Sequence, residues 1–527
     1  MRSRGVVAAA LLSGALVTGG WLMERGGHAT PRDVRAQARL FDEVFQHLRR
    51  DYVDTLSDSA LYRRAVAGVV AELHDPHSVY LDPRRLSQLE ESTTGHYAGV
   101  GIQMDVRDSG ITVVSTLPGT PAERAGIETG DRIVEIDGAP TTGLTDEEAL
   151  KALRGRAGSQ VKVSVDRPGL ATPLPFTLKR AEIDVSPVQH AVMLGDRVGY
   201  VDLTVFSNDA ARDLSRAVDS LHARGARALV LDLRGDPGGL LDQGIDVADF
   251  FLDPGQRIVS TRGRSAEETQ TYVDQDPQQY AGMPLVVLTD SGTASASEIV
   301  AGALQDHDRA LVVGTTTFGK GSAQRVFPLQ EGAIKLTTAR WFTPSGRSID
   351  RPRPSAGDDE EDATPRDTTV RPTFRTDAGR TVLGGGGIVP DVEVAEPVLT
   401  REGRALQRSI GDRMPQFRDV VVAYALSLKG SRAVTSPDFE VTAAMRDELY
   451  RRLGARGIMV DRAVYDAAAP LVNRVLGGEI AQYVFGTGAA FTRSLREDPA
   501  LSKAQSLLQG VSSPAALLAR VPAPAKK

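Results

Sequence analysis

Three polar residues in one stretch of the chain have types and spacings that could do chemistry together. Ser295 lies in "GTASASE", Lys320 lies between two glycines in "TFGKGSAQ", and Gln324 follows four residues later. A serine hydroxyl becomes a nucleophile when a base takes its proton, and a lysine is such a base when burial disfavours its ammonium form. Gln324 falls on the same side as Lys320 in a strand or a helix, so it could orient the lysine amine.

The same residues also have structural interpretations. The segment "SASE" fits a capping box, with Ser295 as the N-cap and Glu298 reaching back, ahead of the helix "IVAGALQ". An isolated lysine such as Lys320 is usually a solvated surface charge. The cap is compatible with catalysis, because backbone N–H groups at a helix N-terminus can stabilise an oxyanion. Ser297 is a competing hydroxyl, and local sequence leaves the choice open.

The sequence offers few other residues that could act as a nucleophile or a base. The chain has no cysteine, which excludes thiolate nucleophiles, disulfides and thiolate zinc sites. The eight histidines are His28, His47, His74, His77, His96, His190, His222 and His307. His307, the nearest to Ser295 in sequence, is expected to be exposed in "LQDHDRA". His74 and His77 have a metal-ligand spacing, but Pro76 between them breaks helical geometry. With neither a suitable histidine nor a G-x-S-x-G motif, a lysine base remains.

The elements that must position these residues differ along the chain. Apolar residues at three- and four-residue spacings predict helices from Pro31 to Thr93, and short β-rich runs follow up to Glu182. From Val198 apolar strands alternate with helical segments, which is typical of an α/β core. The chain is helical again after "GGGGIVPDVEV". The sequence therefore predicts a multidomain α+β protein whose core contains Ser295 and Lys320.

The predicted segments are as follows. They are an export or anchor segment at 1–28, a helical region at 31–93, a β domain at 94–182, a core at 183–398 with an acidic loop at 351–367, a helical region at 399–510 and a flexible tail at 511–527.

The composition of the 527 residues limits the partners. A net charge of -6 gives no basic field for phosphates, so nucleic acid is not expected as a partner. Arg2 and Arg4 precede an uncharged stretch of about 18 residues, which indicates an export signal. The positive-inside rule then places the rest of the chain outside the cytoplasm. Whether residues 6–23 are an anchor, a cleaved peptide or a buried helix stays open.

Taken together, these motifs resemble the carboxy-terminal processing, or tail-specific, peptidase family of serine proteases with a Ser-Lys dyad. In that family the first serine of S-A-S-E is the nucleophile, and a lysine in a G-K-G turn follows 25 residues later, with a glutamine four further on. The spacing of Ser295, Lys320 and Gln324 is the same. The resemblance implies that Ser295 is the nucleophile, Lys320 the general base and Gln324 its orienting partner.

Two further segments carry the resemblance. The first is similar to the family's PDZ domain and comprises "HYAGVGIQM" and "GTPAERAGIETGDRIVEIDG". In that domain a backbone loop captures a C-terminal carboxylate, and the residues that match the loop here are Gly99, Val100, Gly101 and Ile102. The second, "LVLDLRGDPGGLL", is similar to the family's segment L-D-L-R-x-N-P-G-G-L-L. In the family, a glycine N–H of that segment and the N–H of the residue after the nucleophile together form the oxyanion hole. The resulting candidates are Ala296, Gly238 and Gly239. Asp236 stands where the family usually has asparagine.

The resemblance also implies the wider function. It implies a core layer of the ClpP/crotonase type and a serine endopeptidase that forms an acyl enzyme without a metal or cofactor. Its substrates would be proteins or peptides with free C-termini, cleaved on the periplasmic side of a bacterial cell envelope. The terminal helical regions are the candidate surfaces for a homo-oligomer. A non-catalytic peptide-binding protein or chaperone with a PDZ domain is the alternative.

Overall fold

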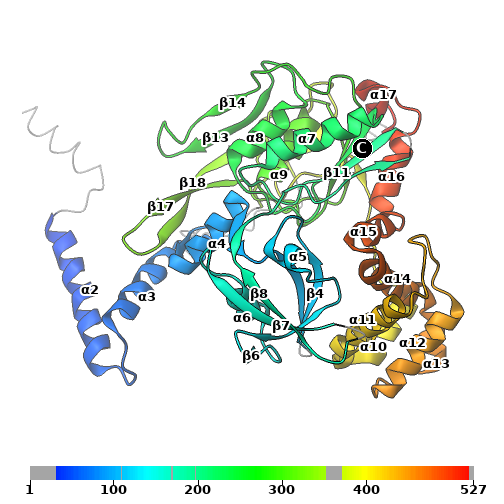
Figure 1. Ribbon diagram of the computed structural model, residues 1–527. Coiled ribbons are helices and arrows are strands. Elements are labelled where there is room, and N and C mark those ends of the chain that lie inside the picture. The colour runs from blue at the N-terminus through cyan, green and yellow to red at the C-terminus, as the bar shows by residue number, and fades with distance from the viewer. Residues whose placement is uncertain (1–30, 108–109, 168–169, 196, 352–370, 522–527) are drawn as a thin grey trace, which may run out of the picture. The chain divides into compact units, whose positions relative to one another are not determined.

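The computed structural model describes residues 31–107, 110–167, 170–195, 197–351 and 371–521 (Figure 1). They fall into two compact units, Met1–Tyr80 and Leu81–Lys527, and each is treated by itself. The predicted export segment and nearly all of the predicted acidic loop lie outside the described residues. Within the described ranges, no helix has the length and apolar character needed to span a bilayer.

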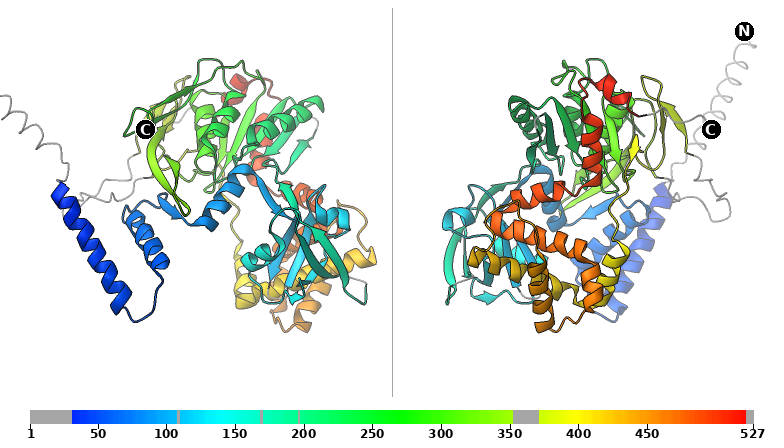
Figure 2. Two further views of the ribbon diagram at one scale, coloured as in Figure 1. Left: turned by 60° about the vertical axis from the view of Figure 1, so that its left-hand side comes forward. Right: turned by 90° about the vertical axis from the view of Figure 1, so that its right-hand side faces the viewer.

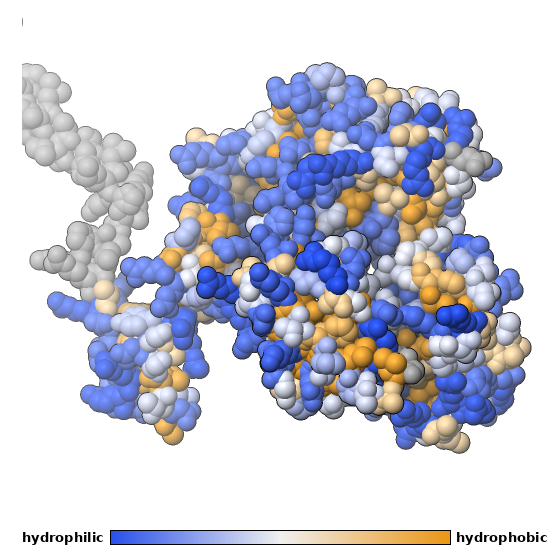
Figure 3. Space-filling view, in the orientation of Figure 1, coloured by the Kyte–Doolittle hydropathy of each residue, from blue (hydrophilic) through white to orange (hydrophobic). Residues whose placement is uncertain are grey.

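The first unit is built on two helices, α2 (Pro31–Asp51) and α3 (Asp58–Ala71), as the apolar periodicity predicted. Phe45 of α2 is buried and its ring lies 4.2 Å from that of Tyr62 on α3, centroid to centroid. Beside it α2 exposes a row of apolar side chains, some of which are visible among the hydrophilic surface in Figure 3. The row consists of Leu40, Phe41, Val44 and Leu48.

Strand β1 (Val79–Leu81) ends with the first residue of the second unit. That unit continues with α4 (Pro83–Thr94) and a small β domain. Its sheet has the order β3-β4-β5-β7-β8, with β6 beside β5. The strands are β3 (Ile102–Arg107), β4 (Gly110–Thr116), β5 (Arg132–Ile136), β6 (Ala139–Pro140), β7 (Gln160–Asp166) and β8 (Leu174–Lys179). Strand β7 buries Val161, Val163 and Val165 and turns the residues between them outward, the alternation expected of a half-buried strand.

Two helices and one strand pair complete this domain. The helices are α5 (Pro121–Ala125) and α6 (Asp146–Leu153), and α6 begins in a capping box of Thr145 and Glu148. The chain enters the domain through β2 (His96–Gly99) and leaves it through β9 (Ala181–Asp184), which pair antiparallel. The two connections therefore form one short ribbon.

The core is a six-stranded sheet with the order β10-β11-β12-β15-β16-β21. The strands are β10 (Ala191–Leu194), β11 (Val198–Asp202), β12 (Ala228–Asp232), β15 (Leu285–Thr289), β16 (Leu311–Gly314) and β21 (Val392–Glu393). β11 to β21 run parallel and β10 is antiparallel to β11. Strands β12, β15 and β16 are buried at every residue, because helices cover both faces of the sheet.

Helices lie on both faces of this sheet (Figure 2), and the two helical layers contact alternate residues of the strands. Leu229 and Leu231 belong to the cluster that contains α7 (Ala210–Ala223), α8 (Leu241–Asp249) and α9 (Ala296–Asp306). Val230 faces the other cluster, which contains α16 (Pro499–Leu508) and α17 (Pro514–Leu518).

The last segments therefore differ from the sequence prediction. The predicted flexible tail at 511–527 contains α17, whose Leu517 is fully buried because it completes the layer on the core sheet. Likewise α16, which was assigned to the helical region at 399–510, belongs to the core.

A second sheet carries the loop of Lys320. In it β18 (Ala333–Phe342) lies between β13 (Arg257–Gly263) and β17 (Ser322–Pro328), and β14 (Thr271–Val273) pairs with β13. A small ribbon of β19 (Thr373–Arg375) and β20 (Thr381–Leu383) follows. Lys320 lies two residues before β17 begins.

Most of the remaining helices have an apolar core of their own. The helices that form it are α10 (Arg401–Ile410), α11 (Met414–Ser431), α12 (Ala443–Ala455), α13 (Arg462–Ala467) and α14 (Ala469–Ile480). By contrast, α15 (Thr487–Leu495) packs with Leu495 on the cluster of the core sheet that contains α16. The sequence predicted this helical region but not what it contacts. In the structure the ammonium group of Lys429 on α11 donates a hydrogen bond of 2.7 Å to the carbonyl of Thr129, so the helices contact the small β domain.

Candidate active site

Ser295 lies in a turn that leaves β15 and starts α9. The carboxylate of Asp290 holds this turn by accepting the N–H groups of Gly292 at 2.9 Å and Thr293 at 3.0 Å. Ser295 is the N-cap of α9 and has φ 57° and ψ -115°. A residue with a side chain rarely adopts such a conformation, which costs about 1–3 kcal/mol and persists only where the surroundings enforce it.

The carboxylate of Glu298 connects this turn to the loop of Lys320. Glu298 is fully buried on α9 and accepts the N–H of Ser295 at 2.8 Å, as the capping box predicted. It also accepts the Thr317 hydroxyl at 2.5 Å and the N–H groups of Gly319 at 2.7 Å and Lys320 at 2.9 Å. The N–H groups of Ser295 and Lys320 bind the same carboxylate oxygen, so one side chain fixes the backbone at both candidate catalytic positions.

Four donors on two oxygens determine the electrostatics of Glu298. Burial raises the pKa of the Glu298 carboxyl, while the hydrogen bonds from Thr317, Lys320, Gly319 and Ser295 oppose that rise. All four partners are donors, so a proton on the carboxyl would displace one of them. Local sequence indicates only the cap, because the other donors lie 19 to 22 residues further along the chain.

The glycines on both sides of Lys320 allow close backbone packing. A Cβ at Gly319 would lie 2.9 Å from the amide nitrogen of Gly387, and one at Gly321 would lie 2.8 Å from that of Asp350. Both distances are shorter than a side chain tolerates, and Gly319 has φ 86°. The close approach predicted from the flanking glycines is therefore present.

The side chain of Gln324 makes its hydrogen bonds within the second sheet. Its amide donates to the hydroxyls of Ser322 at 2.9 Å and Thr337 at 3.3 Å. That Gln324 orients the amine of Lys320 stays a prediction. A second lysine, Lys335 on β18, has a pKa that burial lowers. It pairs with Val326, toward the end of β17 that lies away from Lys320, so it is a lysine against which the role of Lys320 can be tested.

Gly238 packs directly against the turn of Ser295. A Cβ on Gly238 would lie 2.8 Å from the Cβ of Ser295 and from the amide nitrogen of Ala296, so only glycine fits. The N–H of Gly238 donates to the carboxyl of Asp236 at 2.7 Å. Gly239 forms an isolated β-bridge with Phe206. The Gly238 carbonyl accepts the N–H of Phe206, and the Leu240 N–H donates to the carbonyl of Phe206. The N–H of Gly239 takes no part in that bridge.

Asp236 is buried beside the candidate nucleophile. Burial raises its pKa to about 8, and its Oδ2 has no hydrogen-bond partner among the described residues. Its backbone carbonyl accepts the N–H of Ala294 at 2.9 Å and the hydroxyl of Ser297 at 3.2 Å. Because Ser297 is fully buried and engaged there, Ser295 is the hydroxyl of the pair that is partly exposed.

The predicted carboxylate-binding loop connects β2 to β3. The carbonyl of Val100 accepts the Ala122 N–H at 3.0 Å, and that of Gly101 accepts the Leu117 N–H at 2.9 Å. In a trans peptide the C=O and the following N–H point in opposite directions. The N–H groups of Gly101 and Ile102 are therefore directed away from those internal donors, as a carboxylate site requires.

Among the described residues, the histidine nearest to Ser295 in sequence lies at the other end of α9 and does not join the candidate site. His307 was expected to be exposed, but its side chain is only 8% exposed because it bonds the carboxylate of Asp377 at 2.7 Å. Within the described ranges, His96, Asp184 and Asp209 could offer ligand atoms to a metal, all within 4.8 Å of one another. The separation of His96 and Asp184, 3.6 Å, is that of an ordinary ion pair.

A small β domain with a backbone loop of this kind, joined to an α/β core with a strained serine at a helix N-terminus, defines the class of PDZ-containing serine hydrolases. The sequence model of the PDZ domain matches residues 86–166, and that of peptidase family S41 matches residues 197–354. The chain belongs to the carboxy-terminal processing proteases of family S41, which are serine peptidases.

The curated relatives agree on this family. A carboxy-terminal-processing protease of Bartonella bacilliformis is 42% identical over 318 residues, which cover 59% of this chain and 72% of that protein. The carboxyl-terminal-processing protease of Synechocystis is 39% identical over 58% of this chain and 74% of its own length. The solved photosystem II D1 C-terminal processing protease is 30% identical, with a TM-score of 0.37, over 68% of this chain and 88% of its own.

Proposed function

We propose that this chain is an endopeptidase that recognises the C-terminal tail of a protein through its PDZ domain and cleaves it with a Ser295-Lys320 dyad. The substrates are exported proteins with free C-termini, processed or degraded in the cell envelope. We further propose the domain limits 94–182 for the PDZ domain and 183–398 for the protease core, to which α16 and α17 add a layer on the sheet.

One observation supports the pairing of Ser295 with Lys320. The backbone N–H groups of Ser295 and Lys320 lie 2.8 Å and 2.9 Å from the same oxygen of Glu298. Two residues 25 positions apart are therefore neighbours at the N-terminus of α9, where a serine and a lysine base must meet.

The mechanism is an acyl transfer. The neutral amine of Lys320 takes the hydroxyl proton of Ser295 as Oγ attacks the peptide carbonyl, and the lysine then gives that proton to the leaving amine. Water attacks the acyl enzyme with Lys320 again as base, which releases the second product and regenerates Ser295. The amide of Ala296, together with that of Gly238 or Gly239, stabilises the oxyanion. Gln324 orients the lysine amine.

The directions of the N–H groups of Gly101 and Ile102 support tail recognition. A free carboxylate accepts both, and the preceding residues add to the edge of β3 as an antiparallel strand. This mode needs a free C-terminus and no cofactor.

The experiment compares two copies of one unstructured peptide, one with a free C-terminal carboxylate and one amidated. The full chain is tested beside Ser295→Ala, Lys320→Ala and Lys335→Ala. We expect preferential cleavage of the free-carboxylate peptide, with kcat at least about 1,000-fold lower in Ser295→Ala and Lys320→Ala. Lys335→Ala should keep most of the activity.

Each alternative has its own outcome. Loss of activity in Lys335→Ala with retention in Lys320→Ala would make Lys335 the base. Binding of the free-carboxylate peptide without cleavage would favour a peptide-binding protein. Equal cleavage of both peptides would refute recognition of the tail carboxylate.

A further inference from the structure

The carboxyl group of Asp274 faces a second carboxyl group instead of a hydrogen-bond donor. Asp274 directly follows β14 and is only 1% exposed. Its Oδ1 accepts the N–H of Asp276 at 2.9 Å, but its Oδ2 has no partner among the described hydrogen-bond donors. The side chain within hydrogen-bonding reach of Asp274 is that of Asp249, the last residue of α8. Two carboxylates in contact repel each other unless a proton or a cation lies between them.

The other buried carboxyl groups of the described ranges are arranged differently. Asp131, Asp232 and Asp306 lie 2.8 Å, 2.6 Å and 2.8 Å from the nitrogen of an arginine. Glu298 accepts the four hydrogen bonds described above. Asp236 also has an Oδ2 without a partner, but no second carboxyl group acts on it. Contact between two carboxyl groups therefore sets Asp274 apart from these residues.

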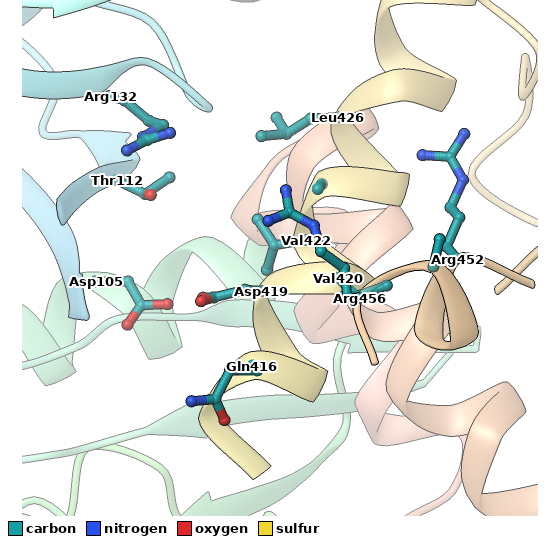
Figure 4. Close-up of a pocket in the computed structure, with 12 residues that line it drawn as sticks. Asp105, Thr112, Arg132, Gln416, Asp419, Val420, Val422, Leu426, Arg452 and Arg456 are labelled. Atoms are coloured by element: carbon teal, nitrogen blue, oxygen red, sulfur yellow. The ribbon is translucent and has the colours of Figure 1, made fainter. Parts of the chain in front are cut away.

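Arginines also accompany the carboxylates in a cavity of about 470 Å³ between the PDZ sheet and α11. The charged residues that line it are Asp105 and Asp419 beside Arg132, Arg452 and Arg456 (Figure 4). The charges that act on Asp274 are those of Asp249 and Asp276, and both are negative. Among the described residues, no side-chain cation balances this group of aspartates.

The surroundings of Asp274 favour a positive charge in three further ways. Burial raises the pKa of the Asp274 carboxyl and Asp249 raises it further, while the N–H of Asp276 opposes that rise. Burial and the charges of Asp242 and Asp249 also raise the pKa of Asp246, one turn earlier on α8. Asp249 lies at the negative end of the α8 dipole, and the last turn of α8 contains no basic residue.

The ligand atoms fit a hard divalent cation. Calcium and magnesium bind carboxylate oxygens together with waters, and magnesium uses only one or two carboxylates. The Oδ2 of Asp274 offers a buried ligand, while Asp249 is partly exposed and leaves a path for the ion and its waters. Neither histidine nor cysteine is among the described groups that act on Asp274, so the set does not favour zinc.

We infer that Asp274 and Asp249 bind a divalent cation, calcium or magnesium, which joins the end of α8 to the end of β14. Helix α8 begins two residues after Gly239, and β14 belongs to the second sheet, which carries the loop of Lys320. The ion therefore stabilises the contact between the core layer and the second sheet. The inference does not depend on the proposed function.

The test measures thermal unfolding of the full chain carrying Ser295→Ala, so that self-cleavage cannot interfere. The chain is treated with a chelator, dialysed, and heated at pH 8 with no added ion or with up to about 10 mM CaCl2 or MgCl2. We expect the preferred ion to raise the melting temperature by about 2–4 °C. Equilibrium dialysis should show one more bound ion per chain than in the same chain with Asp274→Asn added.

The added Asp274→Asn substitution should abolish the rise in melting temperature. Without added ions this variant should melt at least as high as its parent, because the asparagine amide can donate to the carboxylate of Asp249. Asp249→Asn should also abolish the rise. Because Asp249 is partly exposed, this second variant keeps the test decisive if Asp274→Asn does not fold.

The control is Asp412→Asn, which changes an exposed aspartate elsewhere and should respond to the ions as its parent does. Other acids, such as the run at 358–362, are the same in every variant, so the difference between variants is the result that counts. No response to either ion, or a response that survives both Asp274→Asn and Asp249→Asn, would overturn the inference. So would a stability that falls from pH 5 to pH 8 without any response to the ions, because the two carboxyl groups would then share only a proton.

Discussion

Replacing Asp236 by asparagine tests the electrostatics of the candidate site. Asp236 is fully buried, and burial raises its pKa from 3.8 to about 8. A raised carboxyl pKa means that the folded protein holds the proton more tightly than the unfolded chain does. The associated stabilisation is complete below pH 4 and is lost as the pH rises through 8. An asparagine side chain cannot ionise, so the Asp236→Asn variant should lack this loss.

The magnitude follows from the two pKa values. At about 1.36 kcal/mol per pH unit, wild type loses ~4 kcal/mol of folding free energy between pH 4 and pH 7, and ~6 kcal/mol above pH 8. These values are ceilings, because relaxation around the charge lowers them. The variant should therefore be no more stable than wild type at pH 4 and more stable by several kcal/mol at pH 8.

The assay is urea unfolding at pH 4, 6 and 8, followed by tryptophan fluorescence, with Trp341 buried in the second sheet as the reporter of the core. A Trp21→Phe substitution in all variants removes the signal of the other tryptophan. Ser295→Ala serves as the background, so that self-cleavage cannot interfere. Asp412→Asn changes an exposed aspartate and is the matched control: it keeps Asp236, so it should lose stability with rising pH just as wild type does. A difference between Asp236→Asn and wild type that stays constant from pH 4 to pH 8 would refute the reasoning. In the active enzyme, ionised Asp236 opposes the oxyanion beside Ser295, so Asp236→Asn should also keep more activity at pH 9.

The other predictions concern the backbone around the candidate nucleophile. Glu298→Gln replaces an acceptor of four hydrogen bonds by an amide that can accept at only one of its two atoms, so kcat should fall at least about 100-fold. KM should change little, and an equal rise in KM would show that the substrate site is disturbed instead. Gly238→Ala places a methyl group 2.8 Å from the Cβ of Ser295 and should abolish activity in the same kinetic assay. Gly235→Ala is its control, since Gly235 also has a positive φ but nothing within 4 Å of a Cβ; equal damage there would make backbone strain the cause.

Local patterns predicted the parts of this structure that depend on neighbours in sequence. The cap of α9 by Ser295 and Glu298 and the alternation of β7 both follow from spacings within a few residues. The close packing around Lys320 was also predicted, because glycines on both sides of a charged residue have few other uses. The motifs of the protease family added the expected roles of the candidate catalytic residues.

Contacts between distant segments could not be predicted in the same way. The carboxylate of Glu298 accepts hydrogen bonds from the loop of Thr317 and Lys320, and no local periodicity relates those positions to Glu298. Helix α16 has the amphipathic pattern of the helices before it, and only the three-dimensional structure shows that its apolar face covers the core sheet. The raised pKa of Asp236 likewise depends on burial, which the sequence "GDPGG" does not indicate.

The strained conformation of Ser295 explains why so many backbone contacts converge on its turn. A positive φ at a serine costs about 1–3 kcal/mol, and three separate segments hold it in place. Asp290 fixes the start of the turn, the carbonyl of Asp236 accepts the N–H of Ala294, and Glu298 accepts the N–H of Ser295 itself. Because Glu298 also holds the N–H of Lys320, a shift of the lysine loop must alter the turn that presents the serine. The turn of the candidate nucleophile and the lysine loop are therefore held by one carboxylate.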